Sequence, residues 1–481
     1  MPSIDRNSTV PFYQQVYEQI ARGIEDGVYP AGKKLPSIRE CARELGVSNT
    51  TIELAYQRLG EEGYVEARRG SGYTICRIGT TPSIKSDRFS PEYQQNLEQL
   101  IQSSRAYEDA PTPAFNFAYD SVDATLFPFT TWSRICREVF FTEGSDNACL
   151  YNDSQGLGTL RGQISRYLAG EYGLNCAPEQ VLIMPTTRDL VSEITALFNP
   201  TTTVIAMGNP GYDEVGKRLL ERGYKIKEIP AYPYPTWDEI ENAIEGANLV
   251  FATPACQFPT NQPMPLDIRT SLVKWARDHD AYLMDDEYCW EFQSGITRTP
   301  SLSGLDTEGR TITLCTFSNS FTPAVCLSYA VLPPQLMLKW QTKRHGAHPQ
   351  VPWQTQASMT IFMEDDHWRT HIRKTRTAIA RKRQALFDAI EKHLGDKVQV
   401  IEGTCSLFTL VQTTDGRSER ELIDAAERAG VRIYPTSQYW HDEIPADWRY
   451  VLVGYACIPA SDIEPGVKAL AQAWGFLGNA E

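Results

Sequence analysis

Short apolar runs alternate with helix-length segments through the middle of this chain. A strand that is apolar along its whole length is buried on both faces, as in a mostly parallel sheet that is covered by helices on either side. The spacing therefore predicts an α/β fold with a mostly parallel sheet and helices on both of its faces. The expected strands are Val181–Met184, Thr203–Ala206, Leu249–Ala252, Ala281–Met284 and Thr311–Leu314.

The length of 481 residues allows two or three domains, each with its own core. The linker that we expect is rich in Thr, Ser and Pro and holds only a short polar helical stretch, near residues 93–101. A helical run from His371 to Leu394 belongs to a smaller α+β subdomain, with strands near residues 407–411 and 450–453. The expected segments are an N-terminal domain at 1–78, the linker at 79–112, a large domain at 113–370 and the C-terminal small subdomain at 371–481.

Apolar runs and cysteines limit the class of protein. No apolar run approaches the length of a membrane span, and the N-terminus lacks the basic-then-apolar layout of a signal peptide. The 11 cysteines are scattered singly, without a C-x-x-C pair. This pattern predicts reduced thiols in a cytoplasmic protein, with no disulfide framework, no metal site and no membrane partner.

The first 78 residues have the periodicity of three short helices followed by a hairpin. Ser37 and Glu40 form a capping-box pattern before the second helix, and Gly46 provides a tight turn before the third. Two short helices joined by a glycine-containing turn predict a helix-turn-helix, and the hairpin would be its wing. The expected helices lie at about 13–24, 38–45 and 52–59, and the expected hairpin at 64–75.

The same segment carries a specific set of residues between positions 11 and 76. They are Leu35-Pro36-Ser37-Ile38-Arg39-Glu40, Leu45-Gly46-Val47-Ser48, Glu62-Gly63-Tyr64 and Arg69-Gly70-Ser71-Gly72. This set resembles the winged-helix domain of the GntR family. The resemblance implies a DNA-binding domain that recognises a double-stranded operator. The residues that it implies to meet DNA are Arg39, Ser48, Asn49, Thr50, Thr51, Arg68, Arg69 and Gly70.

The charge of this domain provides little attraction for DNA by itself. Residues 1–78 contain as many Lys and Arg as Asp and Glu, so the net charge of −14 resides in the rest of the chain. Asn49 stands where the GntR family usually has arginine, and Leu54 stands where it often has a basic residue. Asn49 can still read an adenine edge, but the attraction to phosphates is reduced. We therefore expect that a homodimer on two half-sites is needed for useful affinity.

Five further motifs follow in order along the body of the chain. They are Leu150-Tyr151-Asn152-Asp153 with Gly156 and Arg161, Asn209-Pro210-Gly211-Tyr212, Thr253 to Thr260, Asp285-Asp286-Glu287-Tyr288, and Thr316 to Tyr329. Together they resemble the fold-type I aminotransferase domain of MocR-type regulators in the GntR superfamily, over about residues 113–475. The resemblance implies a pyridoxal-phosphate pocket, in which Asp286 matches the aspartate at the pyridine nitrogen and Tyr288 the tyrosine at the ring oxygen.

Two groups on which this cofactor depends are replaced in the segment from Thr316 to Tyr329. Asn319 occupies the position of the lysine that forms the Schiff base, and an amide nitrogen cannot form an imine. Cys326 occupies the position of the arginine that holds the cofactor phosphate, and a thiol lacks the permanently charged fork of a guanidinium group. We therefore expect no catalytic residue and no covalently bound pyridoxal phosphate.

Other positions also lack residues with which the family binds the cofactor or the substrate. Pro185 removes a backbone donor from the turn that would cradle the phosphate, although the hydroxyls of Thr186 and Thr187 could bind an anion. Glu214 would repel a substrate carboxylate. Cys256, Asn261 and Leu452 stand where the family pattern has histidine, glycine and a carboxylate-binding arginine. The resulting degenerate pocket is expected to contain Thr186, Thr187, Tyr212, Gln257, Asp286, Tyr288, Asn319 and Cys326.

The sequence thus favours a transcription regulator whose aminotransferase-like domain is inactive and serves dimerisation and the sensing of an unknown small-molecule effector. A first alternative is a pyridoxal-phosphate-dependent aminotransferase, or a regulator that senses this cofactor with intact binding. A second alternative is an architectural DNA-binding dimer without any ligand. A reactive lysine in the pocket would distinguish the first alternative, and ligand binding by the purified protein would distinguish the second.

Overall fold

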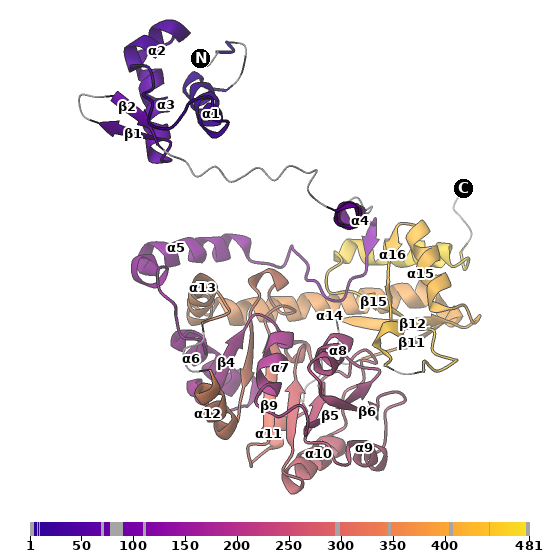
Figure 1. Ribbon diagram of the computed structural model, residues 1–481. Helices are drawn as coiled ribbons and strands as arrows, with labels where there is room; N and C mark the ends of the chain where they lie inside the picture. Colours follow the sequence, from indigo (N-terminus) through magenta and orange to yellow (C-terminus); the bar gives the residue numbers. More distant parts are fainter. Residues whose placement is uncertain are drawn as a thin grey trace. The chain divides into compact units, whose positions relative to one another are not determined.

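The computed structural model of the chain describes residues 4–6, 8, 10–68, 72–76, 90–108, 112–293, 299–344, 348–403, 407–441 and 443–477. The chain divides into two compact units, Met1–Pro111 and Thr112–Glu481 (Figure 1). None of the helices in the described ranges is long and apolar enough to cross a lipid bilayer.

The N-terminal unit contains the predicted helix-turn-helix and the predicted wing. The Ser37 hydroxyl caps one helix by accepting from the Glu40 amide at 3.2 Å, and the Ser48 hydroxyl caps the next by accepting from the Thr51 amide at 3.1 Å. Between these helices Gly46 has a φ of 64°, which glycine adopts without strain. The described elements are α1 (Phe12–Glu25), α2 (Ile38–Leu45), α3 (Asn49–Glu61), β1 (Val65–Arg68) and β2 (Gly72–Ile75).

Helix α3 lies at the centre of the core of this unit. Its buried residues follow the helical spacing i, i+3, i+4 and i+7, and they are Ile52, Ala55, Tyr56 and Leu59. Val16 of α1 packs in the same cluster, and the Tyr56 hydroxyl donates a hydrogen bond to the Pro36 carbonyl at 3.1 Å. Because this stripe is buried, the first turn of α3 presents Asn49 and Thr50 to solvent.

The segment expected to be a linker contains a longer helix than the sequence indicated. Helix α4 (Pro91–Glu108) is 18 residues long, whereas the sequence predicted a helical stretch only near residues 93–101. Tyr93, Leu97, Leu100 and Ile101 recur along it at helical spacing, and all four are exposed within the described structure. The weak apolar pattern therefore supports a helix but not a buried one.

The second unit is organised around a large sheet in which the described strands have the order β4-β10-β9-β8-β7-β5-β6. Strands β5 to β9 run parallel to one another, while β10 is antiparallel to both of its neighbours, β4 and β9. All five predicted runs are strands, so the predicted α/β class is confirmed. The strands are β4 (Val181–Met184), β5 (Val204–Asn209), β6 (Lys225–Pro230), β7 (Leu249–Ala252), β8 (Tyr282–Asp286), β9 (Thr311–Thr316) and β10 (Ser328–Val331).

Alternate residues of the strands enter different cores, which shows that both faces of the large sheet are covered. Leu249 of β7 belongs to the core cluster that contains residues of α7, α8 and α12, whereas its neighbour Val250 belongs to the cluster that contains residues of α9, α10 and α11. Near β4 and β10, the second face is covered instead by α5, α6 and α13. The helices are α5 (Phe129–Asn147), α6 (Gly158–Tyr167), α7 (Thr187–Thr195), α8 (Asp213–Glu221), α9 (Trp237–Ile244), α10 (Leu266–Asp278), α11 (Leu302–Leu305), α12 (Pro334–Lys343) and α13 (Trp353–Glu364).

A smaller antiparallel sheet with the described strand order β11-β12-β15-β14 lies toward the C-terminus. Helix α16 packs along the long helix α14, as Figure 1 also shows, and β3 pairs in parallel with β13. The remaining elements are β3 (Phe115–Asn116), α14 (His367–His393), β11 (Val398–Ile401), β12 (Phe408–Thr413), α15 (Glu419–Arg428), β13 (Val431–Arg432), β14 (Tyr434–Pro435), β15 (Val451–Gly454) and α16 (Ala460–Ala473).

Helix α14 belongs to both parts of this unit. Trp368 near its start packs in the core of the large domain, and Leu386 near its end packs in the core of the small subdomain. Between them the Lys382 ammonium contacts the Asp123 carboxylate at 2.6 Å and the Ala456 carbonyl at 2.9 Å. Both charged side chains of this ion pair are almost fully buried. The expected boundary between residues 370 and 371 lies inside this helix.

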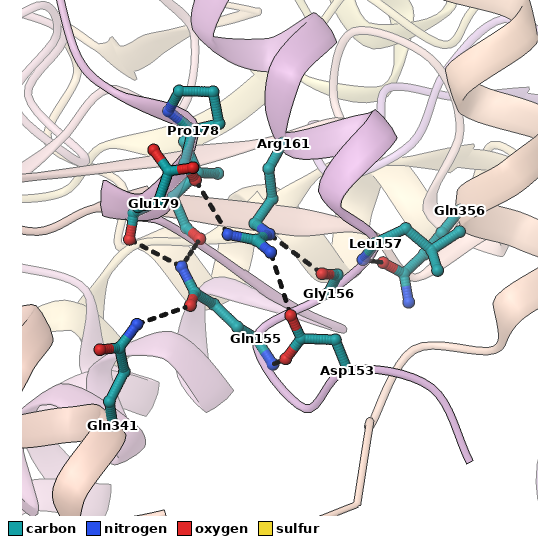
Figure 2. A network of polar contacts seen from close by, with 10 residues as sticks. Asp153, Gln155, Gly156, Leu157, Arg161, Pro178, Glu179, Gln341 and Gln356 are labelled. Carbon is teal, nitrogen blue, oxygen red and sulfur yellow. Dashed lines mark hydrogen bonds and ion pairs between the residues drawn. The ribbon is translucent and has the colours of Figure 1, made fainter.

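The motif around Arg161 builds a network of polar contacts rather than a ligand site (Figure 2). The Arg161 guanidinium donates to the carbonyls of Gly156 and Pro178 at 3.0 and 3.2 Å and contacts the Asp153 carboxylate at 3.0 Å. The Gln155 amide donates to the carbonyls of Glu179 and Val181, each at 2.8 Å. These contacts tie the start of β4 to α6.

We predict that Arg161→Lys lowers the free energy of unfolding by about 1–3 kcal/mol, because a single ammonium group cannot serve three acceptors in different directions. Urea denaturation followed by circular dichroism would measure the change. Arg134→Lys is the matched control, because Arg134 forms an exposed pair with Glu138 on α5 and should change the stability by less than about 0.5 kcal/mol. Equal stability of both variants and the unmodified protein would contradict a structural role for Arg161.

Candidate functional site

A cavity of about 280 Å³ lies where strands β8 and β9 of the large sheet end. The carboxyl ends of parallel strands are the usual place for a ligand site in an α/β fold. The N-terminal ends of α7 and α8 and the start of β12 complete the walls. The lining residues are Tyr119, Asp120, Thr186, Thr187, Arg188, Tyr212, Glu214, Thr253, Phe258, Asp286, Tyr288, Thr316, Ser318, Asn319, Leu407 and Phe408.

Asp286 is the last residue of β8 and is 4% exposed. Its Oδ1 atom is buried without a hydrogen-bond partner among the described residues. Burial, reinforced by the neighbouring Asp285 carboxyl, raises the pKa of Asp286 to about 8. A buried carboxyl oxygen without a partner is costly, so a ligand that brings a positive charge or a hydrogen-bond donor to the Asp286 carboxyl group would be favoured.

Asn319 and Tyr288 are linked at the edge of the cavity. The Asn319 amide donates to the Tyr288 carbonyl at 3.1 Å, and the Tyr288 hydroxyl donates to the Cys256 carbonyl at 3.1 Å. Asn319 lies in the loop that follows β9. Among the described residues that line the cavity there is no lysine.

The start of α7 is already occupied by a carboxylate of the chain. Thr186 accepts from the Asp189 amide at 3.1 Å, and its hydroxyl donates to the Asp189 carboxylate at 2.7 Å. The Arg188 guanidinium contacts the Glu214 carboxylate at 3.3 Å. The Asp189 carboxylate thus lies in the first turn of α7, where its negative charge offsets part of the helix dipole and weakens the attraction for a phosphate group.

Aromatic rings form much of the remaining wall. The Phe258 ring is 6.1 Å from Tyr119, 6.0 Å from Tyr212 and 5.6 Å from Phe408, measured between ring centroids. Burial raises the pKa of Tyr119 and of Tyr212, so both hydroxyls stay protonated at neutral pH. The sequence did not indicate Tyr119, Phe258 or Phe408 as pocket residues, although Phe258 belongs to the Thr253 to Thr260 motif.

The structure places six of the eight expected pocket residues in the cavity lining and two outside it. Gln257 lies beside a neighbouring small cavity, where its amide donates to the Phe258 carbonyl at 3.2 Å. Cys326 is exposed, with a φ of 45°, and its thiol points to the Pro323 carbonyl at 3.5 Å. The lining residues from the expected set are Thr186, Thr187, Tyr212, Asp286, Tyr288 and Asn319.

The substituted positions Cys256 and Asn261 contact each other. The Cys256 thiol lies 3.2 Å from the Asn261 side-chain oxygen, and the Asn261 amide donates to the Phe408 carbonyl at 2.6 Å. Asn261 has a φ of 63°, which asparagine tolerates better than most residues other than glycine. Leu452 is fully buried in the small sheet and does not line the cavity.

The expected DNA-facing residues fall partly within the described structure. Arg39, Asn49 and Thr50 are exposed on α2 and at the start of α3. Ser48 caps the helix, and its hydroxyl lies 2.9 Å from the hydroxyl of Thr51. Arg69 and Gly70 lie outside the described residues, as does the side chain of Arg68.

The comparisons agree with this two-part architecture. Residues 12–75 match the bacterial regulatory proteins of the gntR family, and residues 130–454 match aminotransferase class I and II. The chain belongs to the aminotransferase class I and II family. A GntR-type domain is joined to this aminotransferase-like unit on its N-terminal side.

Relatives share the full length of this GntR–aminotransferase chain. The HTH-type transcriptional regulator YhdI of Bacillus subtilis is 31% identical, with 99% of this chain and 98% of the relative covered. The probable rhizopine catabolism regulatory protein MocR of Rhizobium meliloti is 27% identical, with 98% and 95% covered. An archaeal alanine:glyoxylate aminotransferase shares the fold, with a TM-score of 0.71 at 18% identity over 79% of this chain and 95% of that one.

The fold implies pyridoxal phosphate, and the cavity fits this group only in part. Asp286 could pair with the nitrogen of a pyridine ring between the aromatic walls. The phosphate would meet a helix start that already carries the Asp189 carboxylate and an arginine that contacts Glu214. The described lining also holds no amine for a covalent link. The residues therefore fit the ring of the cofactor but not its phosphate or its carbonyl group.

The raised pKa of Asp286 predicts a specific dependence of stability on pH. Between its ordinary value of 3.8 and about 8, the folded protein holds a proton that the unfolded chain has released. The stabilisation is thus fully present below pH 3.8 and is lost as the pH rises through about 8. In the unmodified protein the free energy of unfolding should fall between pH 5 and pH 8.5. In Asp286→Asn this fall should be smaller by more than about 1 kcal/mol.

Calorimetric melting of both proteins at several pH values would measure this difference. Asp424→Asn is the matched control, since that carboxylate is on the surface of α15 and should leave the pH dependence unchanged. Parallel pH curves for Asp286→Asn and the unmodified protein would contradict the buried, protonated carboxyl group.

Proposed function

We propose that this chain is a DNA-binding transcription regulator in which the aminotransferase-like unit senses a ligand and dimerises but does not catalyse transamination. The observation that carries the proposal is the complete helix-turn-helix with Asn49 and Thr50 exposed at the start of α3. The full-length similarity to proteins named as transcriptional regulators supports it.

The loss of catalysis is inferred from Asn319. Its position in the Thr316 to Tyr329 segment corresponds to the Schiff-base lysine in the resemblance, and its amide is engaged with the Tyr288 carbonyl. An asparagine there can neither form the imine nor move the proton that transamination requires. Cys326, which matches the phosphate-binding arginine, is not among the residues that line the cavity, and its thiol contacts the Pro323 carbonyl.

A role in ligand sensing is favoured over a purely architectural dimer by Asp286. A buried carboxyl oxygen without a partner among the described residues lowers the stability of the fold, and a ligand that pairs with the Asp286 carboxyl group would offset this cost. A scaffold without a ligand would be more stable with an apolar residue at this position.

Dimerisation is supported by apolar side chains that this unit leaves on its surface. Phe141 at the end of α5 is 85% exposed and Tyr151 is 78% exposed, with Phe140 and Leu150 beside them in sequence. Exposed apolar patches commonly mark protein interfaces.

We expect a homodimer in solution without added ligand, and Phe141→Asp should shift the mass measured by light scattering toward the monomer. A monomer of the unmodified protein at micromolar concentration would contradict this expectation.

The DNA-binding role predicts a measurable effect of Arg39. Operators selected from random or genomic fragments with the full-length protein would provide the ligand for a gel-shift or fluorescence titration. Arg39→Ala should weaken binding by about 1–3 kcal/mol if the guanidinium contacts a base or phosphate. Arg420→Ala removes the same charge from the surface of α15 and should leave the affinity unchanged. Absence of any selected sequence would overturn the proposed function.

The inactive site predicts the response to cofactor. The purified protein should be colourless and should lack the visible absorption of a lysine-bound pyridoxal phosphate. Asn319→Lys alone should retain the cofactor poorly, whereas Asn319→Lys combined with Cys326→Arg should retain more than either single variant, because both groups act on one ligand. A yellow unmodified protein that borohydride converts into a covalent lysine adduct would refute the inactive site.

A further inference from the structure

The charges around the cavity favour a cation. Three carboxyl groups line it, those of Asp120, Glu214 and Asp286, whereas the described lining contains a single cationic side chain, Arg188. The Arg188 guanidinium lies 3.3 Å from the Glu214 carboxylate, so its charge is largely compensated. Asp120 is exposed, and the buried Asp286 carboxyl group, whose pKa burial raises, would become the counter-ion of a cation that binds beside it.

Asp286 supplies an independent indication of a ligand. It is more than nine-tenths buried, it lines the cavity, and its Oδ1 atom has no hydrogen-bond partner among the described residues. A ligand ammonium group placed against the Asp286 carboxyl group would donate to it and would favour its charged form.

The aromatic walls provide the second requirement for binding an organic cation. Phe258 is the centre of a cluster in which Tyr119, Tyr212, Tyr288 and Phe408 each lie within 6.5 Å, measured between ring centroids. Aromatic faces attract ammonium groups through their quadrupoles, and they also pack against an apolar ligand body.

The described lining of the cavity offers few groups that would bind an anionic ligand. The N-terminal end of α7 carries the Asp189 carboxylate in its first turn, which reduces its attraction for an anion. The volume of about 280 Å³ is at the lower end of the range for ligand pockets, so the ligand is small.

From these observations we propose that the cavity binds a small organic ammonium ion, with its charged nitrogen at Asp286 and its apolar body between the rings of Phe258, Tyr119 and Tyr212. This inference rests on the proposed function in one respect: the bound amine is the effector of the regulator. The ligand is a primary amine without a phosphate group.

The test uses full-length protein and isothermal titration with three pairs of probes. Phenethylamine, cadaverine and pyridoxamine are compared with their uncharged hydroxyl counterparts 2-phenylethanol, 1,5-pentanediol and pyridoxine, and pyridoxal phosphate serves as the anionic probe. At least one amine should bind at least 10-fold more tightly than its hydroxyl counterpart and more tightly than pyridoxal phosphate. Asp286→Asn should weaken the binding of that amine at least 10-fold, while the surface variant Asp424→Asn should leave its affinity unchanged.

Three results would overturn the inference. They are tighter binding of pyridoxal phosphate than of every amine, equal amine affinity in Asp286→Asn and the unmodified protein, and no binding of any of the three amines at millimolar concentration. Operator binding by the unliganded protein is measured separately. Lost amine binding with intact operator binding contradicts this inference alone, and amine binding without any operator contradicts the proposed function alone.

Discussion

Burial of both faces of the large sheet is the constraint on which the rest of this structure depends. Neighbouring residues of one strand, such as Leu249 and Val250, enter different cores, so helices are required on either side. This packing aligns the ends of β8 and β9 at one edge and places Asp286 and Asn319 at the same cavity. The chemistry available at the cavity is therefore set by which residues terminate these strands and begin α7 and α8.

The sequence predicted this architecture well because apolar runs and caps are local signals. The five predicted strands of the large sheet, the helix-turn-helix and the wing were all found. Strand β6 was missed because Lys225–Pro230 alternates polar and apolar residues, as an edge strand does. Strand β10 was missed because its residues were read only as the end of a cofactor motif. The length of α4 was underestimated for lack of a buried apolar stripe.

The cavity was only partly predictable, because its walls come from segments that are distant in sequence. Asp286, Tyr288 and Asn319 were found through motifs, but Tyr119 and Phe408 reach the cavity by way of the small subdomain. The consequences of single substitutions were also hidden in the sequence. Cys256 and Asn261 appeared as two separate losses, yet their side chains contact each other and support Phe408. No sequence motif singled out Asp189, although its carboxylate adds a negative charge to the first turn of α7.

Helix α14 connects the two cores of the second unit. Its 27 residues form a rod of about 40 Å, anchored at one end by Trp368 in the large-domain core and at the other by Leu386 in the small-subdomain core. The buried ion pair of Lys382 and Asp123 holds the helix at a third point, between these two residues. The small sheet could therefore move at the cavity only together with α14, so the stiffness of this helix limits how far a ligand can displace the wall that Phe408 forms.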